Sequence, residues 1–378
     1  MRLLCITATL SLLAVILVLV PAPHNSVAGP TANAALENSL SPACTPPAEV
    51  ASTPDETAWR LFVASTCPVN NDKYPFVTWE NWIEQTQLYT PSGSVVALES
   101  GQRPSFHMSP LARLLREKKR TKNGRILLPE SADEDCNTKT WSKRTICEEA
   151  RLNPDAQNYV TTEKLMTLQG QAQFVTAGNT FQFPAPGVEV NADWIQLPAC
   201  ANPPQGVHLE TVNSVCYDLG GIHLTSRLID KWIWATFEPQ NDVTNPQRCV
   251  VLGCRDKWGS NPPTTSGAAT RLTQSLSDLM TQANLAPEWK NYRLDGVQID
   301  FLDADGKPTR LGNSIIEGDN VGNPAKMKVS SCITCRDLST LAPAGHPPTN
   351  PNFAIGAPAP IPDGYTPRDF VWSLSLAH

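Results

Sequence analysis

The chain has 378 residues, of which 34 are proline, 11 are cysteine and 10 are tryptophan, and its formal net charge is −6. Prolines interrupt long helices, and a chain of this length can bury a large core, so the composition predicts a loop-rich globular protein. The negative net charge argues against a role in binding nucleic acid.

The first residues have the pattern of an export signal. Arg2 is the only charge before a mostly apolar run from Leu3 to Val20, and small residues follow this run. We expect a signal peptide over residues 1–28 and a periplasmic or secreted protein that has no membrane span after cleavage. The alternative is an uncleaved N-terminal membrane anchor, because the apolar run is barely long enough to cross a bilayer.

Export also explains the cysteines. Cleavage removes Cys5 and leaves an even number, and the cysteines of exported proteins commonly form disulfides. The cysteines fall into sequential couples with short separations, which predict the disulfides Cys44–Cys67, Cys136–Cys147, Cys200–Cys216 and Cys249–Cys254. A closed loop of ten to twenty residues contributes about 3 kcal/mol in the chain-entropy description of disulfides.

The N-terminal part of the mature chain is expected to be irregular. Residues 35–57 are small, polar and proline-bearing, and we expect a flexible arm there, followed by one domain over residues 58–378. A strand-like run is predicted after Trp82, ending in a turn at Pro91. A short amphipathic helix is expected at Leu111–Leu115, and residues 136–173 show only a weak pattern.

The later part of the chain has clearer patterns. Alternating or aromatic-rich segments predict strands at Val188–Val190, Ile222–Ser226, Trp232–Glu238 and Tyr292–Phe301. A helix is predicted over residues 268–283 from leucines at helical spacing, and Asp303–Gly306 predicts a hairpin turn. These elements indicate a single large α+β domain that is β-rich and loop-rich.

The most informative motif is Cys332-Ile333-Thr334-Cys335. Two cysteines at this spacing attach a haem, cycle as a thiol–disulfide pair, or supply half of a zinc site. Haem attachment requires histidine directly after the second cysteine, because that imidazole ligates the iron. Here the position holds Arg336, whose guanidinium stays protonated and has no lone pair to offer.

Several blocks recur in the same order as in a known family. They are Trp59–Ala64, Trp79–Trp82, Phe183–Val190, Trp232–Glu238, Asn291–Leu294, Leu311–Glu317, Ser331–Cys335 and Asp369–Leu374. On these blocks, which cover most of the mature chain, the protein resembles bacterial exported cytochrome-c-like proteins with one haem-attachment motif near the C-terminus. Because the motif comes early in the small all-α cytochrome c fold, that fold is not expected here.

Two departures from this family bear on function. Relatives usually have histidine after the second cysteine and commonly also after the Thr-Phe-Glu block, where this chain has Arg336 and Pro239. If the second histidine is the other axial ligand in relatives, the loss of both is what we expect once iron ligation is no longer required. His223, His346 or a methionine remain as substitute ligands.

Three functions stay open on this reasoning. The preferred one is a disulfide-stabilised binding or scaffold protein that has lost haem ligation, with Cys332–Cys335 as a further disulfide. The first alternative is an electron-transfer protein with covalent haem c on Cys332 and Cys335, which acts with a redox partner. The second is a thiol–disulfide oxidoreductase in which Arg336 lowers the pKa of a neighbouring thiol. No catalytic residue is predicted, and an enzyme is less expected than a non-enzyme.

The metal chemistry is also open. A zinc site from Cys332, Cys335 and two histidines agrees with the ligand preferences of zinc, but the histidines are scattered along the chain. His223 lies in a strand-like segment with apolar neighbours, which favours a hydrogen-bonded core residue over a metal ligand.

Overall fold

A computed structural model of the chain describes residues 41–69, 76–90, 92–95, 146–212, 214–240, 248–261, 269–315, 317–318, 324–344 and 354–377. The signal peptide expected at residues 1–28, the helix expected at Leu111–Leu115, Cys136 and His346 lie outside these residues. As the sequence predicts, the described chain is a single mixed α+β domain built on a large antiparallel sheet, and it differs from the small all-α cytochrome c fold.

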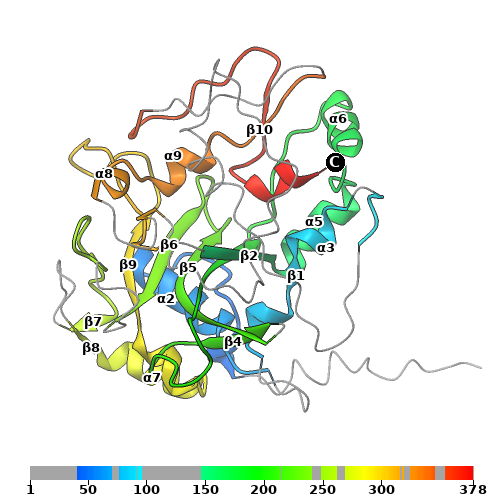
Figure 1. Cartoon of the computed structure of the whole chain (residues 1–378). Helices are drawn as coiled ribbons and strands as arrows, with labels where there is room; N and C mark the ends of the chain where they lie inside the picture. The colour runs from blue at the N-terminus through cyan, green and yellow to red at the C-terminus, as the bar shows by residue number, and fades with distance from the viewer. Residues whose placement is uncertain are drawn as a thin grey trace, which may run out of the picture. The chain divides into compact units, whose positions relative to one another are not determined.

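The main sheet has the strand order β1-β2-β3-β5-β6-β9, and β4 pairs with β5 off this path (Figure 1). Its strands are β1 (Ile83–Glu84), β2 (Ile146–Leu152), β3 (Val188–Gln196), β4 (Leu209–Val212), β5 (Val215–Ser226), β6 (Ile233–Pro239) and β9 (Tyr292–Gln298). All of these pairings are antiparallel. The predicted strands at Val188–Val190, Ile222–Ser226, Trp232–Glu238 and from Tyr292 onward are therefore confirmed.

The remaining elements are short. They are the helices α2 (Pro54–Ser65), α3 (Gln85–Leu88), α5 (Pro154–Thr162), α6 (Leu168–Thr176), α7 (Gln274–Gln282), α8 (Pro324–Met327) and α9 (Cys332–Arg336), the 3-10 helices η1 (Pro42–Cys44), η2 (Thr78–Asn81), η3 (Pro287–Asn291) and η4 (Trp372–Leu376), and the two-residue strands β7 (Ser260–Asn261), β8 (Arg271–Leu272), β10 (Thr340–Leu341) and β11 (Thr366–Pro367). Among the described residues, no helix combines the length and apolar character needed to cross a membrane.

Helix α2 forms the main core with one face of the sheet. Thr53 caps the helix by accepting a hydrogen bond from the Glu56 amide, and Pro54 occupies its first turn. The helix packs on β5, β6 and β9 (Figure 1). The centre of the Phe62 ring lies 4.4 Å from that of Phe237. Burial of several large apolar side chains makes this face the principal source of hydrophobic stabilisation.

The boundaries of three elements differ from the sequence predictions. The folded chain begins before residue 58, because η1 and the first turn of α2 lie inside the stretch expected to be a flexible arm. The run after Trp82 is only the two-residue β1, followed by α3, because Glu84 and Gln87 form a capping box that starts this helix. Strand β2 and helices α5 and α6 occupy the weakly patterned stretch.

The helix predicted from residue 268 starts later than expected. Thr273 caps α7 by accepting a hydrogen bond from the Leu276 amide, and the preceding pair Arg271–Leu272 extends into strand β8. The hairpin turn at Asp303–Gly306 is confirmed, since Leu302 pairs with Pro308 across it and Gly306 has a φ of 75°.

The disulfides follow the predicted couples wherever both partners are described. Cys44–Cys67, Cys200–Cys216 and Cys249–Cys254 are bonded, and Cys147 is also in a disulfide, while Cys136 lies outside the described residues. The Cys44–Cys67 bond joins η1 to the end of α2 and holds the first turn of the fold against the core.

We predict that Phe62→Ala lowers the free energy of unfolding by about 3–5 kcal/mol, because it removes a fully buried ring from the α2 core. Urea unfolding followed by tryptophan fluorescence measures the change. Leu168→Ala is the matched control, since Leu168 is 45% exposed and its truncation is expected to cost less than about 1 kcal/mol. Equal losses in the two variants would contradict the location of the core.

Candidate functional site

The face of the sheet turned away from α2 is polar although it is buried. Side chains alternate along a strand, so the apolar residues Val188, Val190 and Ala192 of β3 face the α2 core. The intervening residues Glu189 and Asp193 therefore lie on the opposite face, where both are almost completely buried. This alternation gives the sheet one apolar and one polar surface.

The same polar face continues on the neighbouring strands. His223 of β5 lies directly opposite Asn191 of β3 and Thr236 of β6, and residues paired across strands project to the same side. We call this set the polar strip: Glu189, Asn191, Asp193, His223, Thr225, Thr236 and Glu238, all of which are buried.

A segment around Asn313 covers the polar strip. The Asn313 side-chain amide is 3.0 Å from His223 Nε2 and 3.3 Å from Thr236 Oγ1. The next residue, Ser314, donates hydrogen bonds from its amide and its hydroxyl to the Glu238 carboxylate, at 2.7 and 2.5 Å. The backbone amide of Asn313 donates a hydrogen bond to Glu317 Oε2 at 2.8 Å, which holds the Glu317 carboxyl group over the polar strip.

Helix α9 brings the CxxC motif to the same place. Gln298, at the end of β9, accepts a hydrogen bond from the Ile333 amide and donates one to Ser331 Oγ, and Ile333 is fully buried. These contacts fix the first turn of the helix, and Cys332 Sγ lies 3.7 Å from the carbonyl oxygen of Leu311.

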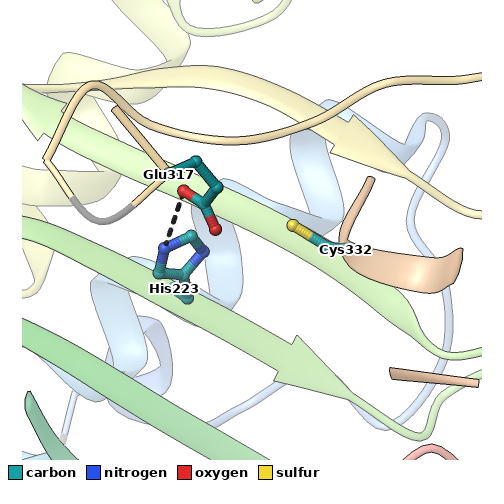
Figure 2. A group of neighbouring side chains, drawn as sticks. All are labelled: His223, Glu317 and Cys332. Carbon is teal, nitrogen blue, oxygen red and sulfur yellow. Dashed lines mark ion pairs between the residues drawn. The ribbon is translucent and has the colours of Figure 1, made fainter. Parts of the chain in front are cut away.

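His223, Glu317 and Cys332 converge on one point, and we call them the His–Glu–Cys cluster (Figure 2). One ligand-type atom from each residue lies within 4.8 Å of the other two. His223 Nε2 is 3.7 Å from Glu317 Oε2 and 3.4 Å from Asp193 Oδ2. The cluster joins three segments that are far apart in the sequence: β5, the cover around Asn313 and the start of α9.

Burial shifts the pKa of every member of this cluster. It lowers the pKa of His223 to about 3, with a further contribution from Arg336, and it raises the pKa of Glu317 to about 8. Burial and the nearby Glu317 raise the pKa of the Cys332 thiol well above its usual range. At neutral pH the imidazole is therefore neutral, so its contacts with Asp193 and Glu317 are polar contacts rather than ion pairs.

Arg336, which replaces the haem-ligand histidine of the motif, is part of a buried ion pair. Its guanidinium donates to Glu189 Oε1 at 2.6 Å and lies 5.9 Å from the centre of the Trp234 ring. Burial by itself lowers the pKa of Arg336, but the attraction of Glu189 and Glu148 outweighs it and the net pKa is raised. The side chain thus stays charged and is held against the central strand.

Among the described residues, the side chains around the CxxC motif do not match the donor set of a c-type haem. Arg336 and Pro239 offer iron no lone pair, and His223 lies in the same tight cluster as Cys332. In a c-type haem the iron sits at the centre of the porphyrin and the cysteines are attached at its edge, so the ring separates the sulfur from an axial ligand. The ligand atoms of His223 and Cys332 lie within 4.8 Å of each other, which leaves no room for a porphyrin between them.

The expected Cys332–Cys335 disulfide is absent, because both residues are thiols in the first turn of α9. Cys332 Sγ is instead directed toward His223 and Glu317 (Figure 2). Arg336 does favour the Cys332 thiolate, as the sequence suggests, but burial and Glu317 outweigh it. This disfavours a reactive thiol, because nucleophilic cysteines have a lowered pKa.

Most of these partners could not be predicted from the sequence. His223 is buried and hydrogen-bonded, as expected, but its neighbours on the polar face are Asp193, Asn313 and Glu317 rather than apolar residues. The available signal was the alternation of polar and apolar residues along β3, β5 and β6, which places His223 on the polar face.

No family model matches the chain, and no curated protein and no solved structure matches it either.

A double-mutant cycle measures the coupling free energy between Arg336 and Glu189, and we predict that the two side chains stabilise the fold together. Arg336→Met and Glu189→Gln should each lower the free energy of unfolding by about 3–5 kcal/mol, because each leaves one charge buried and uncompensated. The double variant should lose clearly less than the two single losses combined. Strictly additive losses in urea unfolding would show that the two side chains do not depend on each other.

The lowered pKa of His223 predicts a pH effect on stability. Its folded-state pKa of about 3 lies below the unfolded value of 6.5, so the unfolded chain binds the extra proton and stability falls as pH drops below 6.5. Between about pH 7.5 and about pH 5, the wild type should lose about 2 kcal/mol more than His223→Gln. Glu317, Asp193 and Arg336 are present in both chains, so the difference isolates His223. An equal loss would mean that His223 is not buried as a neutral ring.

Proposed function

We propose that this chain is an exported, disulfide-stabilised binding protein that no longer ligates haem. The observation that supports this most is the buried ion pair between Arg336 and Glu189. Arg336 occupies the position where the attachment motif requires histidine, and its guanidinium forms an ion pair with Glu189 of β3. Removing either partner would leave a buried charge uncompensated, so this residue now has a structural role.

The disulfides support export. Cys44–Cys67, Cys200–Cys216 and Cys249–Cys254 are bonded, and disulfides persist mainly in oxidising compartments such as the periplasm and the extracellular space. This agrees with the export signal expected at residues 1–28 and with a periplasmic or secreted location.

The polar strip supports binding over a purely structural role. Burying ionisable and hydrogen-bonding groups costs free energy, so a core without a ligand to recognise is expected to be apolar. Here the buried His223, Glu317 and Cys332 meet at one point, and all three have shifted pKa values. Groups with strongly shifted pKa values gather at functional sites more often than elsewhere. We assign no catalytic role to them.

The two alternatives have weaker support. Electron transfer requires haem c on Cys332 and Cys335 and a redox partner, but Arg336 has no lone pair for iron. Thiol–disulfide exchange requires a thiol of lowered pKa, whereas the pKa of Cys332 is raised.

Expression in a host that attaches c-type haem tests this proposal. We expect the exported wild type to be colourless, with an intact mass equal to that of the polypeptide without a tetrapyrrole. Its visible spectrum should lack a Soret band. A red protein whose Soret band survives acid–acetone extraction would overturn the proposal, because only covalently attached haem remains on the chain.

Arg336→His is the matched variant for this experiment, because it restores the attachment motif without any other change. Covalent haem on the variant beside a colourless wild type would assign the loss of haem to Arg336 alone. A wild type that carries as much haem as the variant would show that Arg336 does not prevent attachment.

A further inference from the structure

The His–Glu–Cys cluster combines the three side-chain types that bind zinc in proteins. Imidazole nitrogen, thiolate sulfur and carboxylate oxygen are all common Zn²⁺ ligands, and the mixture suits this borderline-soft ion better than Mg²⁺ or Ca²⁺, which prefer oxygen alone. His223, Glu317 and Cys332 each provide one such atom, and these atoms all lie within 4.8 Å of one another.

The spacing is within reach of a single ion. Around a tetrahedral zinc, bond lengths of about 2.0–2.3 Å put neighbouring ligand atoms about 3.5 Å apart. His223 Nε2 and Glu317 Oε2 are already 3.7 Å apart. Cys332 Sγ lies within 4.8 Å of a ligand atom on each of the other two residues.

Asp193 gives an independent indication of a bound cation. Its side chain is completely buried and one oxygen lies 3.4 Å from His223 Nε2. The other oxygen, Oδ1, has no hydrogen-bond partner among the described residues. Buried polar atoms are nearly always satisfied, so an orphaned carboxylate oxygen beside a histidine needs an explanation. The carboxyl group that carries this atom is placed on the same ring nitrogen of His223 that faces Glu317, so it lies beside the proposed ion.

The charge around the cluster also favours a cation. Burial raises the pKa of Asp193 well above its usual range, and the neighbouring Glu148, Glu317 and Glu238 raise it further. Burial also raises the pKa of Glu317 to about 8. A divalent ion at the cluster would stabilise both carboxyl groups in their ionised forms.

The other clusters of this kind carry no such inference. Cys249 and Cys254, which lie beside Asp295, are joined in a disulfide and have no thiolate to offer. His208 Nε2 forms a 2.8 Å hydrogen bond with Glu80 Oε1, and the His208 ring lies 4.5 Å from that of Trp289. These contacts explain the positions of His208 and Glu80 as parts of the packed core.

We propose that His223, Glu317 and Cys332 bind one Zn²⁺ ion, with Asp193 as a buried acidic neighbour of the site. This inference rests on the proposed function, because Cys332 must be a thiol rather than a thioether of haem. Three protein ligands leave one position of a tetrahedral ion open to water or a small ligand, as in exchangeable rather than purely structural zinc sites. Glu317 and Cys332 are only partly buried, which leaves that position open to solvent.

Metal binding to the full exported chain tests the inference. The purified protein is stripped with a chelator under anaerobic conditions, then dialysed against Zn²⁺ and analysed for bound metal. We expect stoichiometric Zn²⁺ in the wild type and none above background in Cys332→Ser or His223→Gln. Asp193→Asn should weaken Zn²⁺ binding, because it removes an acidic group beside the proposed ion.

Cys335→Ser is the matched control, because it removes the other thiol of the same helix turn, which is outside the cluster. It should keep stoichiometric Zn²⁺. Co²⁺ provides a second readout that needs no variant: Co²⁺-loaded wild type should show a thiolate-to-cobalt charge-transfer band together with intense visible bands of tetrahedral cobalt. The band should persist in Cys335→Ser.

The outcomes separate the two proposals. A red, haem-loaded wild type would overturn the proposed function and the zinc site together. A colourless wild type that binds no Zn²⁺, or whose Co²⁺ complex lacks the charge-transfer band, would overturn the zinc site alone. Loss of Zn²⁺ in Cys335→Ser to the same extent as in Cys332→Ser would overturn the assignment of ligands, because it would place the ion on the two cysteines.

Discussion

The contact on which the polar half of the molecule depends is the ion pair between Arg336 and Glu189. It joins α9 to the central strand β3, and Ser373 Oγ donates to the same carboxylate at 3.3 Å. Two C-terminal segments are thereby held on the sheet by one buried anion. Because a buried charge is tolerated only when it is paired, Glu189 and Arg336 constrain each other, and the position of α9 constrains where Cys332 lies.

The two faces of the sheet differ in chemistry and in their contribution to stability. The face under α2 is apolar and contains Phe62, Phe237 and other large side chains, so it supplies most of the hydrophobic stabilisation. The opposite face is equally buried but polar, and it costs stability unless its groups are paired with one another or with a ligand. Residues of the cover, such as Asn313 and Ser314, make several of these pairs. Asp193 lies next to the His–Glu–Cys cluster, and its Oδ1 has no hydrogen-bond partner in the described part of the chain.

The surroundings of the CxxC motif point to chemistry other than haem attachment. In the cytochrome-c-like proteins that the sequence resembles, the motif serves haem attachment, which needs a ligand histidine beside it. In this chain the residue beside it is a structural arginine, and the first cysteine faces a histidine and a carboxylate. The proposed change is therefore from a thioether that holds a porphyrin to a Cys332 thiol that is able to hold an ion directly.

Local pattern was enough to predict part of this protein. Alternation in Val188–Val190 and Trp232–Glu238 predicted strands, and short separations between cysteines predicted three disulfides that the structure contains. The identity of Arg336 was enough to show that the position after the second cysteine offers iron no ligand. The start of α7, the short β1 and the elements between residues 146 and 176 were decided by caps and by pairing with distant strands, which a local window does not contain. The candidate site depends on the tertiary structure most of all. Cross-strand register and the cover around Asn313, which is 90 residues from His223 in sequence, bring the three side chains together, because contacts of this range are set by the packing of the whole sheet.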